Sequence, residues 1–186
     1  MSDATLVRRI SRWAILPAAA ALGLGLSAFT ASTAEAATYY CNGFKATIVG
    51  TNGHDDIEGT SGRDVIVGLA GNDDIDGNGG DDVICAGSGH DEVDGGSGND
   101  YIHGGSGHDE LEGGRGNDRI HGSSGNDHIE GESGNDKLYG GSGHDLVEGG
   151  PGTDTVSGGA GNDTVKQRYA SEREEDRWED RYGYDD

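Results

Sequence analysis

The sequence predicts an all-β solenoid, in which short strands stack along one axis. Three observations lead to this prediction. Thirteen consecutive nine-residue units run without insertion or deletion from Gly50 to Lys166. In every unit, position four is Gly, position six is Asp and position eight is Ile, Leu or Val. This period covers 117 of the 186 residues, so we expect stacked repeats in place of a single compact core.

Each unit divides into a turn and a strand. Position one is Gly in all units but the fifth, which carries Ala86. Gly reaches positive φ angles at little cost, so the first positions are suited to a tight turn. Among the last three positions only the middle side chain is reliably apolar, which is the alternation of a strand with one buried face. Position eight is therefore expected to point into the core.

The unit resembles G-G-x-G-x-D-x-U-x, the calcium-binding nonapeptide of the RTX or hemolysin-type family, throughout residues 50–166. The resemblance implies a right-handed parallel β-roll (a β-helix solenoid) with two units per coil, in which each turn stacks on the turn two units later. It also implies that Ca²⁺ lies between stacked turns, with an Asp from each. The implied metal ligands are Asp55, Asp64, Asp73, Asp82, Asp91, Asp100, Asp109, Asp118, Asp127, Asp136, Asp145, Asp154 and Asp163.

Residue chemistry supports calcium independently of the family name. Ca²⁺ takes about six to eight oxygen ligands from carboxylates and backbone carbonyls. Seven turns on one edge and six on the other leave six and five gaps, so we expect up to about 11 ions. Six units lack Gly at position two, and because their residues resist the left-handed conformation we expect weaker sites beside them. These residues are Thr51, Thr60, Leu69, Asn78, Ser123 and Glu132.

The charge composition explains why a metal is needed. The chain has 35 acidic and 13 basic side chains and a formal net charge of -22. Without metal the carboxylates repel one another, and one aliphatic side chain per strand is too small a core to offset the entropy of ordering the chain. We expect the repeats to be disordered without calcium. The acidic surface also argues against nucleic-acid binding.

Residues 1–36 have the order of a secretory signal peptide. Three arginines precede an apolar run from Trp13 to Phe29, and small residues end the segment at Ala36. A membrane anchor is the alternative, but the run is rich in Ala and Gly and contains Pro17. We therefore predict cleavage after Ala36 and a secreted, extracellular mature chain without a membrane span.

The segments on either side of the repeats have separate predictions. Cys41 and Cys85 are the only cysteines, and an even number in an exported chain favours a disulfide over metal binding by two thiols. Residues 37–49 would fold back along the first coils to reach Cys85, which predicts an N-terminal cap over the end of the core. Residues 167–186 abandon the repeat and predict a charged C-terminal tail or cap.

No catalytic assembly is visible, because too few residues remain outside the signal and the repeats for a catalytic domain. We expect no enzyme activity. Most histidines fall at position five or at outward strand positions and are interpreted as polar spacers. The alternative for His103 and His121, which are two units apart, is a transition-metal pair.

The expected function is that of a secreted calcium-binding protein whose roll folds on binding several Ca²⁺. The alternative is a calcium-dependent adhesion or extracellular-matrix module. In that case one flat face of the roll binds a cell surface, a polysaccharide or another protein.

Overall fold

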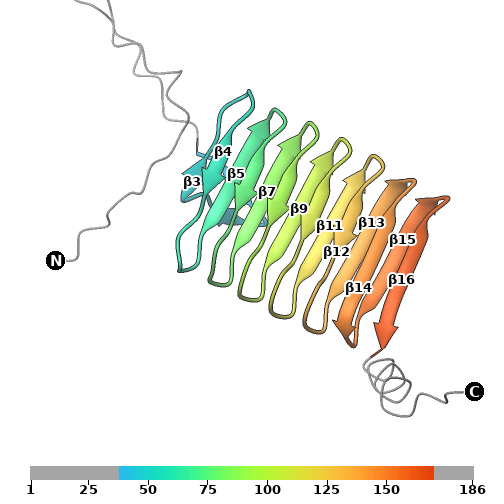
Figure 1. Ribbon diagram of the computed structural model, residues 1–186. Helices are drawn as coiled ribbons and strands as arrows, with labels where there is room; N and C mark the ends of the chain where they lie inside the picture. The colour runs from blue at the N-terminus through green and yellow to red at the C-terminus, as the bar shows by residue number, and fades with distance from the viewer. Residues whose placement is uncertain (1–37, 170–186) are drawn as a thin grey trace, which may run out of the picture.

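The computed structural model describes residues 38–169, which form one all-β body with no helix in that range (Figure 1). The signal peptide predicted for residues 1–36 lies outside the described residues, as does most of the predicted tail. Within residues 38–169 no helix is long and apolar enough to cross a membrane.

Two parallel sheets of seven strands form the two faces of the solenoid. Strand neighbours within each sheet are 18 residues apart, as in the pairing of Leu111 with Ile129. The first sheet contains β4 (Asp56–Glu58), β6 (Asp74–Asp76), β8 (Glu92–Asp94), β10 (Glu110–Glu112), β12 (His128–Glu130), β14 (Leu146–Gly152) and β16 (Thr164–Tyr169). The second contains β3 (Ile48–Val49), β5 (Val65–Ala70), β7 (Val83–Ser88), β9 (Tyr101–Ser106), β11 (Arg119–Ser124), β13 (Lys137–Gly143) and β15 (Thr155–Gly161).

Consecutive units alternate between the two sheets, so two units complete one coil. The result is a right-handed parallel β-roll of about seven coils, and the predicted fold class is confirmed. All turns of the odd-numbered units lie on one edge of the roll, and all turns of the even-numbered units lie on the other edge. Each position of the unit therefore repeats as a ladder along the roll axis.

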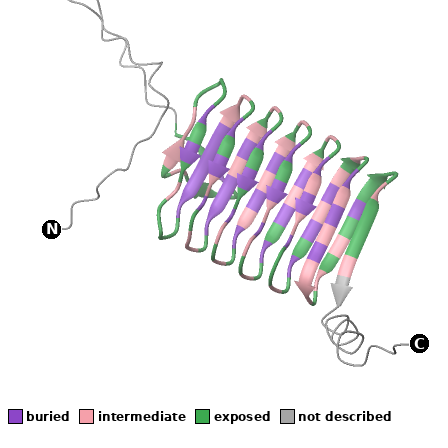
Figure 2. Ribbon diagram, in the orientation of Figure 1, coloured by how far each residue is buried: buried purple, intermediate pink, exposed green. Residues whose placement is uncertain are grey.

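The core is a single ladder of position-eight side chains between the sheets. From Ile66 to Val147 these aliphatic residues are at most 1% exposed, which confirms that position eight points inward (Figure 2). Full burial of one such side chain stabilises the fold by about 1.5–3 kcal/mol. The ladder becomes more exposed to solvent toward the last described units, where Val165 is 46% exposed.

The N-terminal segment contacts the roll in two places, and Ile48 packs against the aliphatic core. Its hairpin, β1 (Tyr40–Cys41) with β2 (Phe44–Lys45), lies on the outer face of the second sheet and not across the end of the core. The reason is the predicted Cys41–Cys85 disulfide, which is present: Cys85 stands at position nine and points outward, so its partner must lie outside the sheet. Strand β3 pairs with β5 and adds a rung to the roll itself.

The boundary between the repeats and the tail also shifts. Strand β16 continues past Lys166, and Tyr169 pairs with Gly152 after an irregularity in register between Glu148 and Pro151. The sheet therefore includes the first three residues of the segment that the sequence assigned to the tail.

Candidate metal-binding turns

The position-six aspartates form one ladder along each edge of the roll. From Asp55 to Asp145 they are buried, with 1–7% exposure. From Asp73 onward, their Oδ1 atoms accept hydrogen bonds from the backbone N–H of the aspartate two units earlier, as in the bond from Asp100 to Asp118 Oδ1 at 2.8 Å. The structure thus stacks the predicted site residues along each edge.

The second carboxylate oxygen has no such partner. In the third to the eleventh unit, Oδ2 is buried and accepts no hydrogen bond. A buried charged acceptor without a partner costs about 1–3 kcal/mol or more. These nine residues are Asp73, Asp82, Asp91, Asp100, Asp109, Asp118, Asp127, Asp136 and Asp145.

Oxygen atoms from two stacked turns converge beside position one. A Cβ added at Gly95 would lie 2.9 Å from Asp100 Oδ2 and 2.9 Å from the carbonyl oxygen of Gly113. Glycine leaves this point open between the turns. Ala86 is the exception, and its methyl group is fully buried at the corresponding place in the fifth unit.

The turn backbone takes left-handed angles even where glycine is missing. Leu69, Asn78, Ser123 and Glu132 have φ angles of 85°, 65°, 89° and 62° at position two. The stacked turns therefore impose the turn shape on these residues, against a cost of about 1–2 kcal/mol per residue. Weaker ion sites beside them stay a prediction.

Burial changes the acidity of the ladder. Loss of water around the side chain, followed by the charges of neighbouring aspartates, raises the pKa of Asp100 to about 7. The same loss of hydration raises the pKa values of Asp82, Asp109, Asp118 and Asp136 to about 6. The metal-free roll therefore holds protons on carboxylates that are ionised in water, and a bound cation would compete with those protons.

A second ladder runs beside the aspartates at position five, and sequence reasoning missed it. The side chains there accept hydrogen bonds from the backbone two units later: His90 Nδ1 from the N–H of His108 at 2.8 Å, and Asn99 Oδ1 from that of Asn117 at 3.0 Å. His, Asn and Asp share a suitably placed acceptor, and their recurrence at position five is the signal that was available. These residues close turn amides and are more than spacers.

A scan against protein-family models finds four copies of the RTX calcium-binding nonapeptide repeat, at residues 49–84, 86–120, 112–147 and 130–165. The chain belongs to this family. A search of curated proteins finds no match. The RTX match covers most of the roll, and this family binds calcium.

The residues of the RTX turns fit calcium. From the third to the eleventh unit, the turns offer a carboxylate oxygen without a partner, and backbone carbonyl oxygens of the next stacked turns converge beside it, as at Gly95. Within residues 38–169 no three His, Cys, Asp or Glu side chains gather closely enough to hold a metal by themselves. Backbone oxygens must then complete the ligand set, which suits Ca²⁺ and not Zn²⁺, since zinc takes its ligands from Cys, His and carboxylate side chains. The ligand role of each of the thirteen aspartates stays a prediction.

Proposed function

We propose that this RTX protein is secreted and binds several calcium ions between its stacked turns, and that these ions complete its fold. One observation carries the proposal: nine buried aspartate oxygens lie in two straight ladders without any hydrogen-bond donor. Each added Ca²⁺ would neutralise two neighbouring carboxylates and supply the missing partner for Oδ2. The cost of burying the ladder would then become a gain that depends on the metal.

The predicted signal peptide gives this dependence a role. Extracellular modules bind calcium with dissociation constants of about 10⁻⁴–10⁻³ M, well above the level at which a cytosolic protein is loaded. A chain that folds only with such weakly bound ions stays unfolded until it leaves the cell. We therefore propose that the protein is a structural or calcium-responsive extracellular module with no catalytic step.

The direct test is equilibrium dialysis of the EDTA-treated chain against calcium and, separately, against magnesium. We expect several Ca²⁺ per chain at millimolar free calcium and far fewer Mg²⁺, since magnesium requires near-ideal octahedral geometry and keeps its own water. A chain that retains no calcium under these conditions would rule the proposal out.

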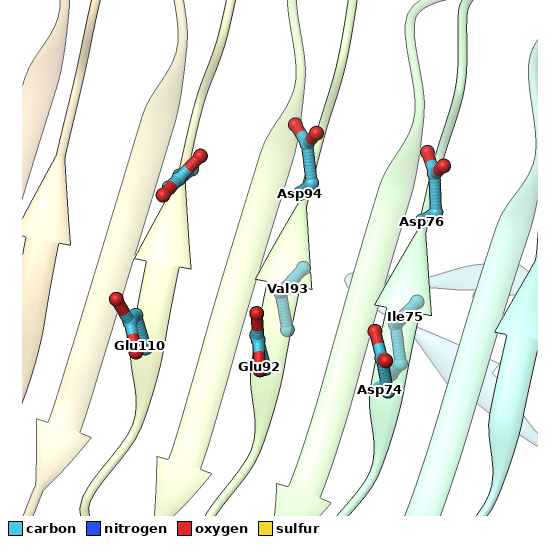
Figure 3. Close-up of a pocket in the computed structure, with 8 residues that line it drawn as sticks. Asp74, Ile75, Asp76, Glu92, Val93, Asp94 and Glu110 are labelled. Carbon is cyan, nitrogen blue, oxygen red and sulfur yellow. The ribbon is translucent and has the colours of Figure 1, made fainter.

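A second candidate, adhesion, is favoured by the contrast between the two outer faces of the roll. The first sheet is acidic, with Asp74, Asp76, Glu92, Asp94 and Glu110 projecting side by side from β6, β8 and β10 (Figure 3). Ile75 and Val93 point to the opposite side of this sheet, into the core (Figure 3). This face repels any anionic partner.

The second sheet carries a face of another kind on β9, β11 and β13. The rings of His121 and Tyr139 stack at 4.7 Å between centroids, and the Arg119 guanidinium lies 5.7 Å from the Tyr139 centroid. We call this set the aromatic-basic face, and it consists of Tyr101, His103, Arg119, His121, Lys137 and Tyr139. Flat rings beside cations suit a polysaccharide with acidic sugars, because aromatic rings stack on sugar rings and the cations pair with carboxylates.

Sedimentation with an insoluble acidic polysaccharide, with and without calcium, tests the adhesive role. We expect binding only with calcium, and a loss of at least about tenfold in affinity in Tyr139→Ala, which corresponds to about 1.4 kcal/mol. The matched control is Glu92→Ala on the acidic face, which should bind as the wild type does. No sedimentation in either condition would remove this candidate and leave calcium binding unaffected.

A further inference from the structure

The first two turns of the roll differ from all later ones in backbone shape. Neither Thr51 nor Thr60 has a positive φ angle, and neither do Gly53 and Gly62 at position four. In the third to the eleventh unit, positions two and four are both left-handed or otherwise at positive φ. The two threonines thus stand where the repeat changes its conformation.

The threonines also supply what the later carboxylates lack. The Thr60 backbone N–H donates to Asp64 Oδ2 at 2.7 Å, and its hydroxyl Oγ1 lies 2.8 Å from the same oxygen. Thr51 makes the equivalent contacts to Asp55 Oδ2, at 2.6 Å from the amide and 3.0 Å from the hydroxyl. The carboxylates of the first two units are therefore satisfied by the chain itself, unlike the nine that follow.

The hydroxyl occupies the middle of each of these turns. Thr60 Oγ1 lies 3.0 Å from the carbonyl oxygen of Gly62 and accepts a hydrogen bond from the Gly62 N–H at 3.2 Å. The other oxygen of Asp64, Oδ1, lies 3.3 Å from the hydroxyl of Thr47, which lies between β2 and β3. The carboxylate and carbonyl oxygens that could bind a cation thus already contact the neutral threonine hydroxyl.

We propose that Thr51 and Thr60 take the place of calcium in the first two turns, so that ion sites begin at the third unit. This inference rests on the proposed function and restricts it. Units three to thirteen leave five gaps on one edge and four on the other, which sets the number of bound ions at no more than nine. The same number of aspartate oxygens lacks a partner.

The threonine turns give the roll an end that holds its shape without metal. The hairpin packs on the strands that follow, where Cys41 is buried against Val65, Val67 and Val83, and the disulfide ties this hairpin to the fourth unit. A preformed first coil offers a template on which each calcium-loaded coil adds, and this lowers the cost of starting a stacked array. Calcium then extends the roll from the N-terminal end.

Native mass spectrometry of the calcium-saturated protein counts the ions. We expect no more than nine in the wild type and two more in the double variant Thr51→Gly/Thr60→Gly. The matched control is Ser123→Gly, which changes the same position in a turn whose Asp127 Oδ2 already lacks a partner, and it should leave the count unchanged. More than nine ions in the wild type, or no gain in the double variant, overturns the inference, whereas no ions at all overturns the proposed function.

Hydrogen exchange in EDTA gives a readout that does not involve metal. The amides of Thr51 and Thr60 should exchange at least tenfold more slowly than those of Gly105 and Gly114, which occupy the same position in later turns. Protection at residues 51 and 60 should disappear in the double variant. Equal exchange at all four amides of the wild-type protein contradicts a metal-free first coil.

Discussion

The first two turns and the nine that follow differ in the hydrogen-bond partners that they give to the aspartate at position six. Both bury an aspartate at position six, and both present Oδ2 to the inside of a turn. In the first two the chain provides a hydroxyl and an amide, whereas in the later ones it provides nothing. The invariant Asp of the repeat therefore does not define an ion site by itself, because the residue at position two decides whether its carboxylate is still available.

The two regions also differ at position four, because no turn precedes the first two turns on either edge of the roll. A Cβ added at Gly62 has no neighbour within 4 Å, but one added at Gly107 would collide with the carbonyl oxygen of Gly89. Later turns thus depend on glycine at position four for close approach, whereas the first turns do not.

The largest expected effect follows from this difference. Gly107→Ala should destabilise the calcium-saturated roll by about 5 kcal/mol, because the methyl group meets backbone and φ is 145°. Gly62→Ala, the matched control, should change the free energy of unfolding by no more than about 0.5 kcal/mol. Denaturant unfolding at fixed free calcium measures both, and equal losses in the two variants would contradict a close backbone contact at Gly107.

Removal of the disulfide should loosen the first coils more than the middle of the roll. Replacement of Cys41 and Cys85 by Ala releases a loop whose closure is worth about 4 kcal/mol on the chain-entropy estimate. We expect hydrogen exchange to accelerate first in β1, β3 and β5, with the middle of the roll less affected at saturating calcium. Unchanged protection in these strands would mean that the hairpin holds its place by packing alone.

Asparagine in place of a single aspartate separates charge from shape. Asp100→Asn keeps the ladder hydrogen bond at Oδ1 but removes the charge, so it should lose at least one calcium ion and about 2 kcal/mol of calcium-dependent stability. Asp55→Asn, with threonine donors already in place, should keep the full ion count. Ion counting by mass spectrometry compares the two, and the loss of an ion in Asp55→Asn would place a site in the first turn.

Acidity should act on the later turns. Because burial raises the pKa of Asp100 to about 7 and of Asp82 and Asp118 to about 6, the metal-free roll binds protons that the unfolded chain releases. The metal-free roll is then destabilised above pH 7 and regains stability as the pH falls through 7 and 6 toward 4. More of the roll should therefore form without calcium at pH 5.5 than at pH 7.5. Far-UV circular dichroism in EDTA at the two pH values measures this, and equal spectra would contradict it.

Much of the fold follows from the sequence because the period leaves few choices. The resemblance to the RTX repeat implies which turns stack, and the aliphatic at position eight fixes which side of each strand is buried. The disulfide follows from the cysteine count. These features depend on local chemistry that repeats, so one correct unit predicts all thirteen.

Other features depend on contacts that the repeat does not encode. The hairpin lies on the outer face because Cys85 stands at an outward position and Val65 and Val83 offer an apolar surface beside it. Leu69 and Glu132 adopt left-handed angles because stacked neighbours outweigh their intrinsic preference. The role of Thr51 and Thr60 depends on distances to their own carboxylates, which a substitution at a glycine position does not reveal.

Far-UV circular dichroism of the EDTA-treated chain during a calcium titration shows whether the roll needs calcium to fold. If calcium completes the aspartate ladders, a cooperative change from coil to β-structure should accompany calcium, reverse with EDTA and be absent with magnesium. The residual signal before calcium should correspond to no more than the first coil. A spectrum that shows the full β-structure without metal, or a change that magnesium reproduces, would contradict folding that depends on calcium.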